Sequence, residues 1–330
     1  MTMINQLKII LLILTLFAVS CSNEESSKNT TIVSIIKEKN TRRYNAIEKG
    51  LLDQIHSDKM DVQINFYTLG NDDLSTIKTA NNVRDDNSSI DIVIGENATL
   101  LSMNIIVPQT IVFAGCFDDL SLSNIARNRI QNNNITGVYI NLDITKYVKI
   151  ISEKEVNSIG YLYTKNSEMS ANISKYIMKY CSNENMTYYP LVIGENLNTL
   201  DIENTLKSRN IDYLILANEE YINNNIYSIN HLCDKYSIPL INTDISDAIN
   251  TAILFSLDFN YYYMGRQLAL LLNDVINNNG KTEGLNFVRL SDSYKILLNE
   301  DIAKEYNIKF TEEILDKSSL LIKDGQLIKK

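Results

Sequence analysis

Tryptophan is absent from the 330 residues, and proline, histidine and cysteine occur only three, two and four times. Both histidines, His56 and His231, fall within predicted helices and in no nucleophile motif. The sequence also contains no P-loop, no glycine-rich dinucleotide-binding turn and no H-E-x-x-H helix. Because catalysis needs a poised acid, base or nucleophile, we expect a protein that is not an enzyme and that uses no metal and no cofactor.

Positive charge is scarce as well. The 40 Asp and Glu residues outnumber the 31 Lys and Arg residues, which leaves a net charge of −9. A nucleic-acid partner is excluded on this ground, because binding phosphates needs a basic face. Beyond the N-terminus, no apolar run is long enough to cross a bilayer. The length is sufficient for two globular domains.

The cysteines exclude two further kinds of site. Beyond Cys21 there are three, Cys116, Cys181 and Cys233, and an odd number without short spacings gives neither a zinc site nor a disulfide framework. Cys181 ends one predicted helix and Cys233 lies within another. These two helices should cover opposite faces of one sheet, so the two cysteines should be out of reach of each other. We expect all three to be small buried core residues.

Residues 1–21 are typical of a secretory signal that ends in an anchor. Lys8 precedes an apolar run over residues 9–19, and Ala18-Val19-Ser20 come directly before Cys21. This arrangement resembles a bacterial lipobox, which implies that Cys21 is lipid-modified and becomes the first mature residue. A plain signal peptide with an incidental cysteine is the alternative. Residues 22–30 are polar and suit a flexible tether, so we expect an extracytoplasmic protein held on the cell membrane by lipid.

Short apolar strands alternate with amphipathic helices along the rest of the chain, a pattern typical of parallel sheets covered by helices. Strands are predicted over residues 31–36, 62–67, 90–94, 109–114, 132–141, 158–163, 187–193, 211–216, 238–242, 252–257 and 286–290. Helices are predicted over residues 45–56, 74–83, 169–180, 200–209, 222–236 and 299–306, with a further helix from about 262. Beyond these, the chain should end in a frayed polar tail.

The stretch over residues 251–272 decides how these elements group. It follows a second complete series of strands and helices, and its apolar helix needs a sheet to cover. We therefore predict that the chain returns here to its first half, giving an α/β protein of two Rossmann-like lobes with three crossings. Lobe 1 comprises 31–139 plus 249–284, and lobe 2 comprises 140–248 plus 285–330. Two lobes joined in this way leave a cleft.

Ligands of open parallel sheets bind beyond the carboxyl ends of the strands, which selects candidate ligand-binding residues without any motif. From lobe 1 these are Glu38, Asn97, Phe117 and Asp118; from lobe 2, Thr164, Ser170, Asn218 and Asp244; after the returning strand, Asp258 and Tyr261.

Chemical type suggests the role of each candidate. Helices opening at Asn97 and Ser170 would offer unpaired backbone N–H groups to a carboxylate. Asp118, Asp244 or Asp258 could pair with an ammonium group. Phe117 and Tyr261 could flank an apolar or aromatic body. The alternative for each Asp or Asn taken singly is a helix cap or a turn residue.

Several segments resemble, in order and spacing, the bacterial ABC-transporter substrate-binding lipoproteins of the tryptophan/tyrosine-binding group. These are Ile135-Thr136-Gly137-Val138, Ile159-Gly160-Tyr161-Leu162-Tyr163, Ile211-Asp212, Ile238-Pro239-Leu240 and the run Tyr262-x-x-Gly265-Arg266-Gln267. The resemblance covers residues 31 to about 310 and implies the periplasmic-binding-protein type I fold. At the site, Ser170, Asp118 and Asp244 match family positions, whereas the loops at 37–41, 114–117 and 164–165 depart from the family pattern.

This resemblance also implies a function. We expect an extracytoplasmic, monomeric lipoprotein that binds a small, amino-acid-like and in this group aromatic molecule by hinge closure. It would deliver that molecule to the permease and ATPase subunits of an ABC importer. A ligand-binding receptor or sensor lipoprotein of the same fold, not coupled to transport, is the alternative.

Overall fold

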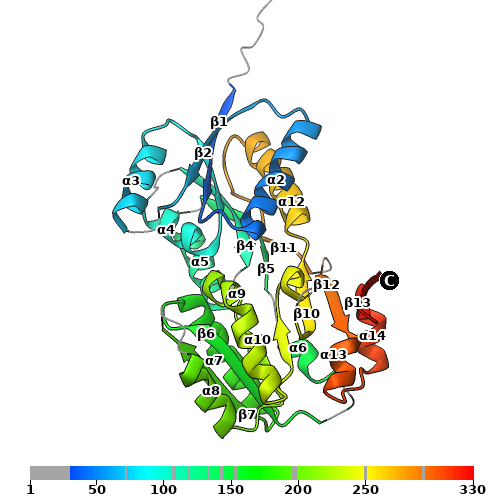
Figure 1. Cartoon of the computed structure of the whole chain (residues 1–330). Coiled ribbons are helices and arrows are strands. Elements are labelled where there is room, and N and C mark those ends of the chain that lie inside the picture. Colours follow the sequence, from blue (N-terminus) through cyan, green and yellow to red (C-terminus); the bar gives the residue numbers. More distant parts are fainter. Residues whose placement is uncertain are drawn as a thin grey trace, which may run out of the picture.

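The computed structural model describes residues 30–70, 73–105, 109–116, 119–132, 134–141, 144–151, 153, 155–194, 199–248, 251–291 and 294–330. Figure 1 shows two lobes, with the first strand of the chain in lobe 1 and the C-terminus beside lobe 2. Each lobe is built around its own sheet.

Lobe 1 has a six-stranded, fully parallel sheet in the order β11-β5-β4-β3-β1-β2. Its strands are β1 (Thr31–Lys37), β2 (Val62–Thr68), β3 (Ile90–Ile94), β4 (Thr110–Cys116), β5 (Ile135–Ile140) and β11 (Val288–Arg289). Helices α2 (Arg42–Ser57) and α12 (Tyr261–Asn277) cover one face. Helices α3 (Asp73–Arg84), α4 (Glu96–Ile105) and α5 (Asp119–Asn132) cover the other. The near-continuous apolar sequence of β3 reflects this two-sided burial.

Lobe 2 has an eight-stranded sheet in the order β14-β13-β12-β10-β9-β8-β6-β7, which is mixed because β12 runs antiparallel to β10 and β14 antiparallel to β13. Its strands are β6 (Ser158–Thr164), β7 (Thr187–Ile193), β8 (Tyr213–Leu216), β9 (Leu240–Asn242), β10 (Ile253–Phe259), β12 (Tyr294–Asn299), β13 (Leu320–Lys323) and β14 (Gln326–Lys329). Its helices are α6 (Thr145–Val148), α7 (Glu168–Asn183), α8 (Thr199–Ser208), α9 (Glu220–Asn224), α10 (Ile226–Lys235), α11 (Ile245–Ala248), α13 (Glu300–Glu305) and α14 (Glu312–Lys317).

The chain crosses between the lobes three times, after β5, after β10 and after β11, as predicted. Two of the predicted lobe boundaries are wrong. Strand β10 pairs with β9 and β12, so it belongs to lobe 2, and the return to lobe 1 comes at Asn260 rather than at 249. Strand β11 pairs with β5, so residues 288–289 belong to lobe 1. An apolar strand fits either sheet, and only its pairing decides which.

Helices α2 and α12 lie side by side on lobe 1 and cross at two glycines (Figure 1). A Cβ atom on Gly50 would lie 2.0 Å from the carbonyl oxygen of Tyr262, and one on Gly265 would lie 1.9 Å from the carbonyl oxygen of Ile47. Arg266 Nε donates to Gln54 Oε1 at 2.7 Å beside this crossing. The Y-x-x-G-R-Q run therefore fastens the returning helix to α2.

The predicted frayed tail is wrong. Residues 312–329 form α14 and a hairpin of β13 and β14, which extends the sheet of lobe 2. The hairpin turns at Asp324 and Gly325, both with positive φ, and the carboxylate of Asp301 accepts their two backbone N–H groups at 2.8 Å. Helix α5 and strand β12 were not predicted at all. In α5, polar residues outnumber the apolar ones and conceal the helical periodicity, whereas in β12 the apolar run Ile296-Leu297-Leu298 is only three residues long.

Cys181 and Cys233 are buried and carry free thiols, and burial raises the pKa of Cys181 to about 11. The side chain of Cys116 and the whole of Cys21 lie outside the described residues. Across the described ranges, no helix combines the length and the apolar character needed to cross a bilayer.

Candidate functional site

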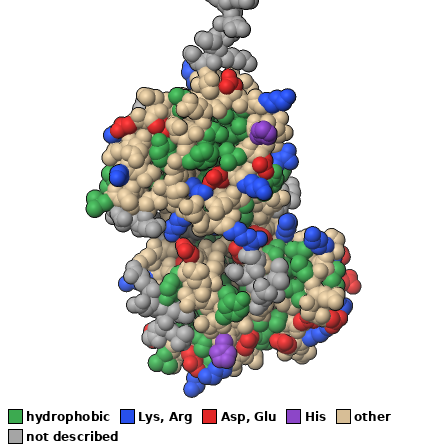
Figure 2. All heavy atoms as spheres, turned by 45° about the horizontal axis from the view of Figure 1, so that its top comes forward, with side chains coloured by type: hydrophobic (Ala, Val, Ile, Leu, Met, Phe, Trp, Pro, Cys, Tyr) green, Lys and Arg blue, Asp and Glu red, His purple; other side chains and the backbone are tan. Residues whose placement is uncertain are grey.

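A cleft of about 520 Å³ lies between the lobes, at the carboxyl ends of β1, β3, β6 and β8. Figure 2 shows acidic and basic side chains gathered where the two lobes meet. The cleft is lined from both sides by Glu38, Lys39, Thr41, Arg43, Tyr44, Glu96, Asn97, Thr164, Asn166, Ser167, Asn218, Glu219, Glu220, Tyr221 and Asn224. Four predicted site residues are therefore brought together here, namely Glu38, Asn97, Thr164 and Asn218.

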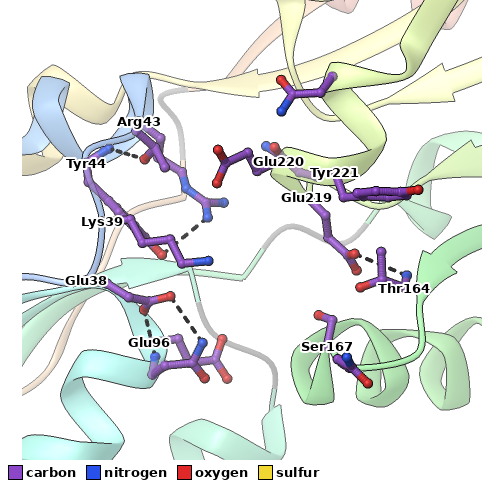
Figure 3. A pocket seen from close by; sticks show the side chains of 15 residues that line it. Glu38, Lys39, Arg43, Tyr44, Glu96, Thr164, Ser167, Glu219, Glu220 and Tyr221 are labelled. Carbon is purple, nitrogen blue, oxygen red and sulfur yellow. Dashed lines mark hydrogen bonds between the residues drawn. The ribbon is translucent and has the colours of Figure 1, made fainter. Parts of the chain in front are cut away.

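On the lobe 1 wall, the carboxylate of Glu38 caps the N-terminus of α4 (Figure 3). It accepts from Asn97 N at 2.9 Å, from Asn97 Nδ2 at 3.1 Å and from Ala98 N at 3.4 Å. Gly95 makes room for this contact, because a Cβ atom there would lie 2.5 Å from Glu38 Oε2. The prediction that the α4 terminus offers unpaired N–H groups to a ligand is thus wrong, since the protein's own carboxylate already holds them.

Arg43 and Tyr44, in the first turn of α2, also face the cleft. The guanidinium of Arg43 stacks on the ring of Tyr44, with its Cζ atom 4.8 Å from the ring centroid, and Nη2 donates to Tyr44 Oη at 3.3 Å. Figure 3 shows the carboxylate of Glu220, from the opposite lobe, pointing toward this guanidinium. Charges of both signs therefore face each other across the cleft.

On the lobe 2 wall, Glu219 Oε2 accepts from Thr164 N at 3.1 Å. Helix α7 begins beside it and is capped by Ser167, whose Oγ accepts from Ser170 N at 3.2 Å. Ser170 itself is 1% exposed, receives a hydrogen bond from Ser167 Oγ and does not line the cleft. The backbone N–H of Ser170 is therefore held by Ser167 and is not the unpaired donor that was predicted.

Three other predicted residues lie outside the lining, near the crossing between β10 and α12. Asp244 forms an ion pair with Arg42 of lobe 1 at 3.3 Å. Asp258 accepts a hydrogen bond from Phe259 N, while burial, with Asp244 as a lesser contributor, raises its pKa to about 6. Tyr261 is buried and packs edge-on against Phe259. These side chains lie at the connection between the lobes rather than in the cleft wall.

Phe117 and Asp118 lie outside the described residues. Conversely, eleven lining residues are not among the candidates selected from the sequence. Six of them lie close to the same strand ends as the candidates: Lys39, Thr41, Glu96, Asn166, Ser167 and Glu219. The other five, Arg43, Tyr44, Glu220, Tyr221 and Asn224, lie in α2 or α9, helices that follow strands of the sheets. Extending the strand-end rule into the helix that follows each strand would have found them. No cluster of His, Cys, Asp and Glu suited to a metal ion occurs among the residues that the structure describes.

Solved structures with the same fold are numerous. An ABC domain from Streptococcus pneumoniae in complex with L-Trp is 16% identical, with a TM-score of 0.72 over 89% of this chain and 100% of that one. A ligand-free, open substrate-binding protein with adhesive properties from Clostridium difficile is also 16% identical, with a TM-score of 0.68 over 86% and 96%. An ABC transporter solute-binding protein from Bacillus halodurans with bound myo-inositol is 10% identical, with a TM-score of 0.56 over 84% and 98%.

These likenesses show the fold, the two-lobed periplasmic-binding-protein type I architecture, and not the ligand. A search of curated proteins gives no match. The family profile described as ABC transporter substrate binding protein matches residues 30–321, which is most of the chain. The chain belongs to the ABC transporter substrate-binding protein family.

Proposed function

We propose that this protein captures a small, amino-acid-like molecule in its interlobe cleft and delivers it to the permease and ATPase of an ABC importer. The observation that carries the proposal is the two-sided lining. Glu38, Arg43 and Asn97 come from lobe 1, and Thr164, Asn218 and Glu219 come from lobe 2. A ligand that contacts both walls stabilises the closed arrangement by its differential affinity for it.

A contact between two of the crossings supports this proposal. The hydroxyl of Tyr294, which begins β12, donates at 3.2 Å to the carbonyl oxygen of Asn141, which follows β5, so these two crossings lie close together. Phe259 packs edge-on against both Tyr294 and Tyr261. A compact hinge lets each lobe rotate as a unit around a few backbone torsions.

Ligand binding and closure are tested together. A thermal-shift screen of amino acids, nucleosides and sugars should find a compound that raises the melting temperature, because such a compound binds the folded state only. Small-angle scattering with that compound should then give a smaller radius of gyration. Uptake of the labelled compound should be lost in cells that lack the protein. A ligand that binds without compaction or uptake would contradict the proposal.

We further propose that Cys21 carries the lipid that holds the protein on the outer side of the cell membrane, with residues 22–30 as the tether. The small-residue run before Cys21 supports this. Metabolic labelling with an alkyne fatty acid should mark the wild type and not Cys21→Ser. The variant should also be recovered in the soluble fraction. Equal labelling of both would show that Cys21 is not the acceptor.

A further inference from the structure

The charges of the cleft are unequal. Four glutamates line it, Glu38, Glu96, Glu219 and Glu220, against two basic residues, Lys39 and Arg43. Two of the four are held within lobe 1: Glu38 caps α4, and Glu96 accepts a hydrogen bond from Ser121. The lobe 2 wall contributes Glu219 and Glu220 and, among its described lining residues, no Lys or Arg. The potential on that wall therefore favours a cation.

Glu219 is a lobe 2 carboxylate with only one hydrogen-bond donor among the described residues. Its Oε2 accepts a single hydrogen bond, from Thr164 N, and its Oε1 is buried without a hydrogen-bond partner among the described residues. Glu38, by comparison, accepts from three donors. A buried carboxylate oxygen without a donor is costly, because it has lost its water and gained nothing in exchange. A donor brought by the ligand removes this cost.

The residue types that are missing from the described cleft lining constrain the polarity of the ligand. Apart from Tyr44 and Tyr221, every described lining residue is polar or charged, and Ile, Leu, Val, Met and Phe are missing from that set. An apolar ligand would offer no hydrogen-bond partner to the amide of Asn224 on closure. The cleft is matched to a molecule that donates and accepts hydrogen bonds along its length.

We infer that the ligand is a small polar molecule with an ammonium group, and that Glu219 is the acceptor of that ammonium. The inference rests on the proposed function and adds the charge and polarity of the ligand to it. Glu219 lines the cleft, so a ligand bound there lies within reach of this residue. The remaining polar part of the ligand faces Arg43 and Lys39 of lobe 1, so the molecule spans both walls.

Matched ligand pairs test the inference on the unmodified protein. Calorimetry compares polar amines (L-serine, L-glutamine, L-lysine and putrescine) with counterparts in which a hydroxyl replaces each ammonium. L-Tryptophan and myo-inositol represent an aromatic amine and a neutral polyol. We expect at least one polar amine to bind, its hydroxyl counterpart to bind at least tenfold more weakly, and L-tryptophan to bind more weakly than that amine.

Glu219→Gln then removes the charge and keeps a carbonyl oxygen for Thr164 N. It should weaken binding of the best amine at least tenfold while the ligand-free protein melts within a few degrees of wild type. The matched control is Glu184→Gln, which removes an exposed lobe 2 carboxylate paired with Lys149 outside the cleft and should leave affinity unchanged. If Glu219→Gln does not fold, the ligand pairs alone decide.

The outcomes separate the two proposals. Equal binding of amine and hydroxyl counterparts, tighter binding of L-tryptophan, or unchanged affinity in Glu219→Gln overturns the inference and leaves the proposed function standing. Tighter binding of myo-inositol overturns the inference and the amino-acid-like ligand of the proposed function, and leaves delivery to an importer standing. If no compound of either series, and none of the wider thermal-shift screen, binds or compacts the protein, both fail.

Discussion

The two walls of the cleft differ in how their polar groups are satisfied. On lobe 1, Glu38 receives three hydrogen bonds and closes the N-terminus of α4. On lobe 2, Glu219 receives one, and its second oxygen is buried without a partner. The difference teaches that Glu38 is satisfied within lobe 1 without a ligand, whereas Glu219 of lobe 2 has an oxygen to which a ligand can donate.

The interiors of the lobes also differ, and this difference gives the largest expected effect. Asp91 of β3 is fully buried in lobe 1, and burial, opposed by the hydrogen bond from Ser88 and aided by nearby Asp86, raises its pKa to about 7. The native state therefore holds a proton that the unfolded chain releases near pH 4. The contribution of this proton to the free energy of unfolding should be fully present below about pH 4. It should be lost as the pH rises to about 7, by an amount on the order of 4 kcal/mol.

Urea unfolding of the wild type and of Asp91→Asn between pH 5 and 8 checks this. Asp258, with a pKa of about 6, adds a loss of the same sign that ends near pH 6, so the two losses overlap below pH 6 and the part between pH 6 and 7 comes from Asp91 alone. The variant should lack the loss between pH 6 and 7 and should show a smaller loss below pH 6, the part that comes from Asp258. Hydrogen exchange should place the loss in β3 and not in β8. Identical profiles would show that Asp91 is not the titrating group.

Gly265→Ala should give the next largest effect, because lobe 1 has no room at the crossing of α2 and α12. The new Cβ would meet the carbonyl oxygen of Ile47 at 1.9 Å and Leu51 N at 2.7 Å. We expect a loss of about 3 kcal/mol in the free energy of unfolding, at the upper end of overpacking costs. Gly194→Ala in lobe 2 is the matched control, since nothing lies within 4 Å of its Cβ position. Equal melting temperatures for both variants would contradict the close crossing.

Glu38→Ala and Glu219→Ala compare the two walls directly in the absence of ligand. Removing the cap of α4 should cost about 1 to 2 kcal/mol. Removing Glu219 should cost less or should even stabilise the protein. The substitution also removes a carboxylate that accepts only one hydrogen bond in the folded state, and with it the cost of burying its unpartnered oxygen. Chemical denaturation of both variants measures the difference. A larger loss in Glu219→Ala would mean that its carboxylate is needed for folding rather than for a ligand.

The smallest expected effect concerns the ion pair between Arg42 and Asp244, which joins the two lobes at 3.3 Å with the side chain of Arg42 69% exposed. An exposed pair contributes under about 1 kcal/mol and is screened by salt. Asp244→Asn should therefore shift the melting temperature slightly at low salt and not at 1 M salt. A salt-independent shift would assign Asp244 a role other than this pair.

Much of the fold could be predicted because apolar periodicity reports burial. β3 and β7 lie at their predicted residues, and the three crossings follow from the order of elements. What could not be predicted depends on pairing between distant segments. The apolar sequence of β10 fits either sheet, and β14 is exposed along its length, so neither carries a signal for its place.

The candidate site shows the same division between features that the sequence predicts and features that it does not. The strand-end rule finds Glu38, Asn97, Thr164 and Asn218 because backbone topology alone brings these positions to one edge. The rule cannot tell which polar groups already have a hydrogen-bond partner within the protein. That Glu38 fills the α4 terminus, and that Ser167 fills the α7 terminus, depends on side-chain reach across 59 and 3 residues respectively.

The crossing of α2 and α12 at Gly50 and Gly265 has a consequence for motion. With backbone against backbone, α2 has no freedom to slide or roll on its neighbour, and α12 continues from β10 through Asn260 alone. Any change of torsion near residue 260 must therefore carry Arg43 and Tyr44 along as part of one rigid piece. A distance probe attached to α2 would therefore report the movement of the whole of this rigid piece relative to the opposite wall.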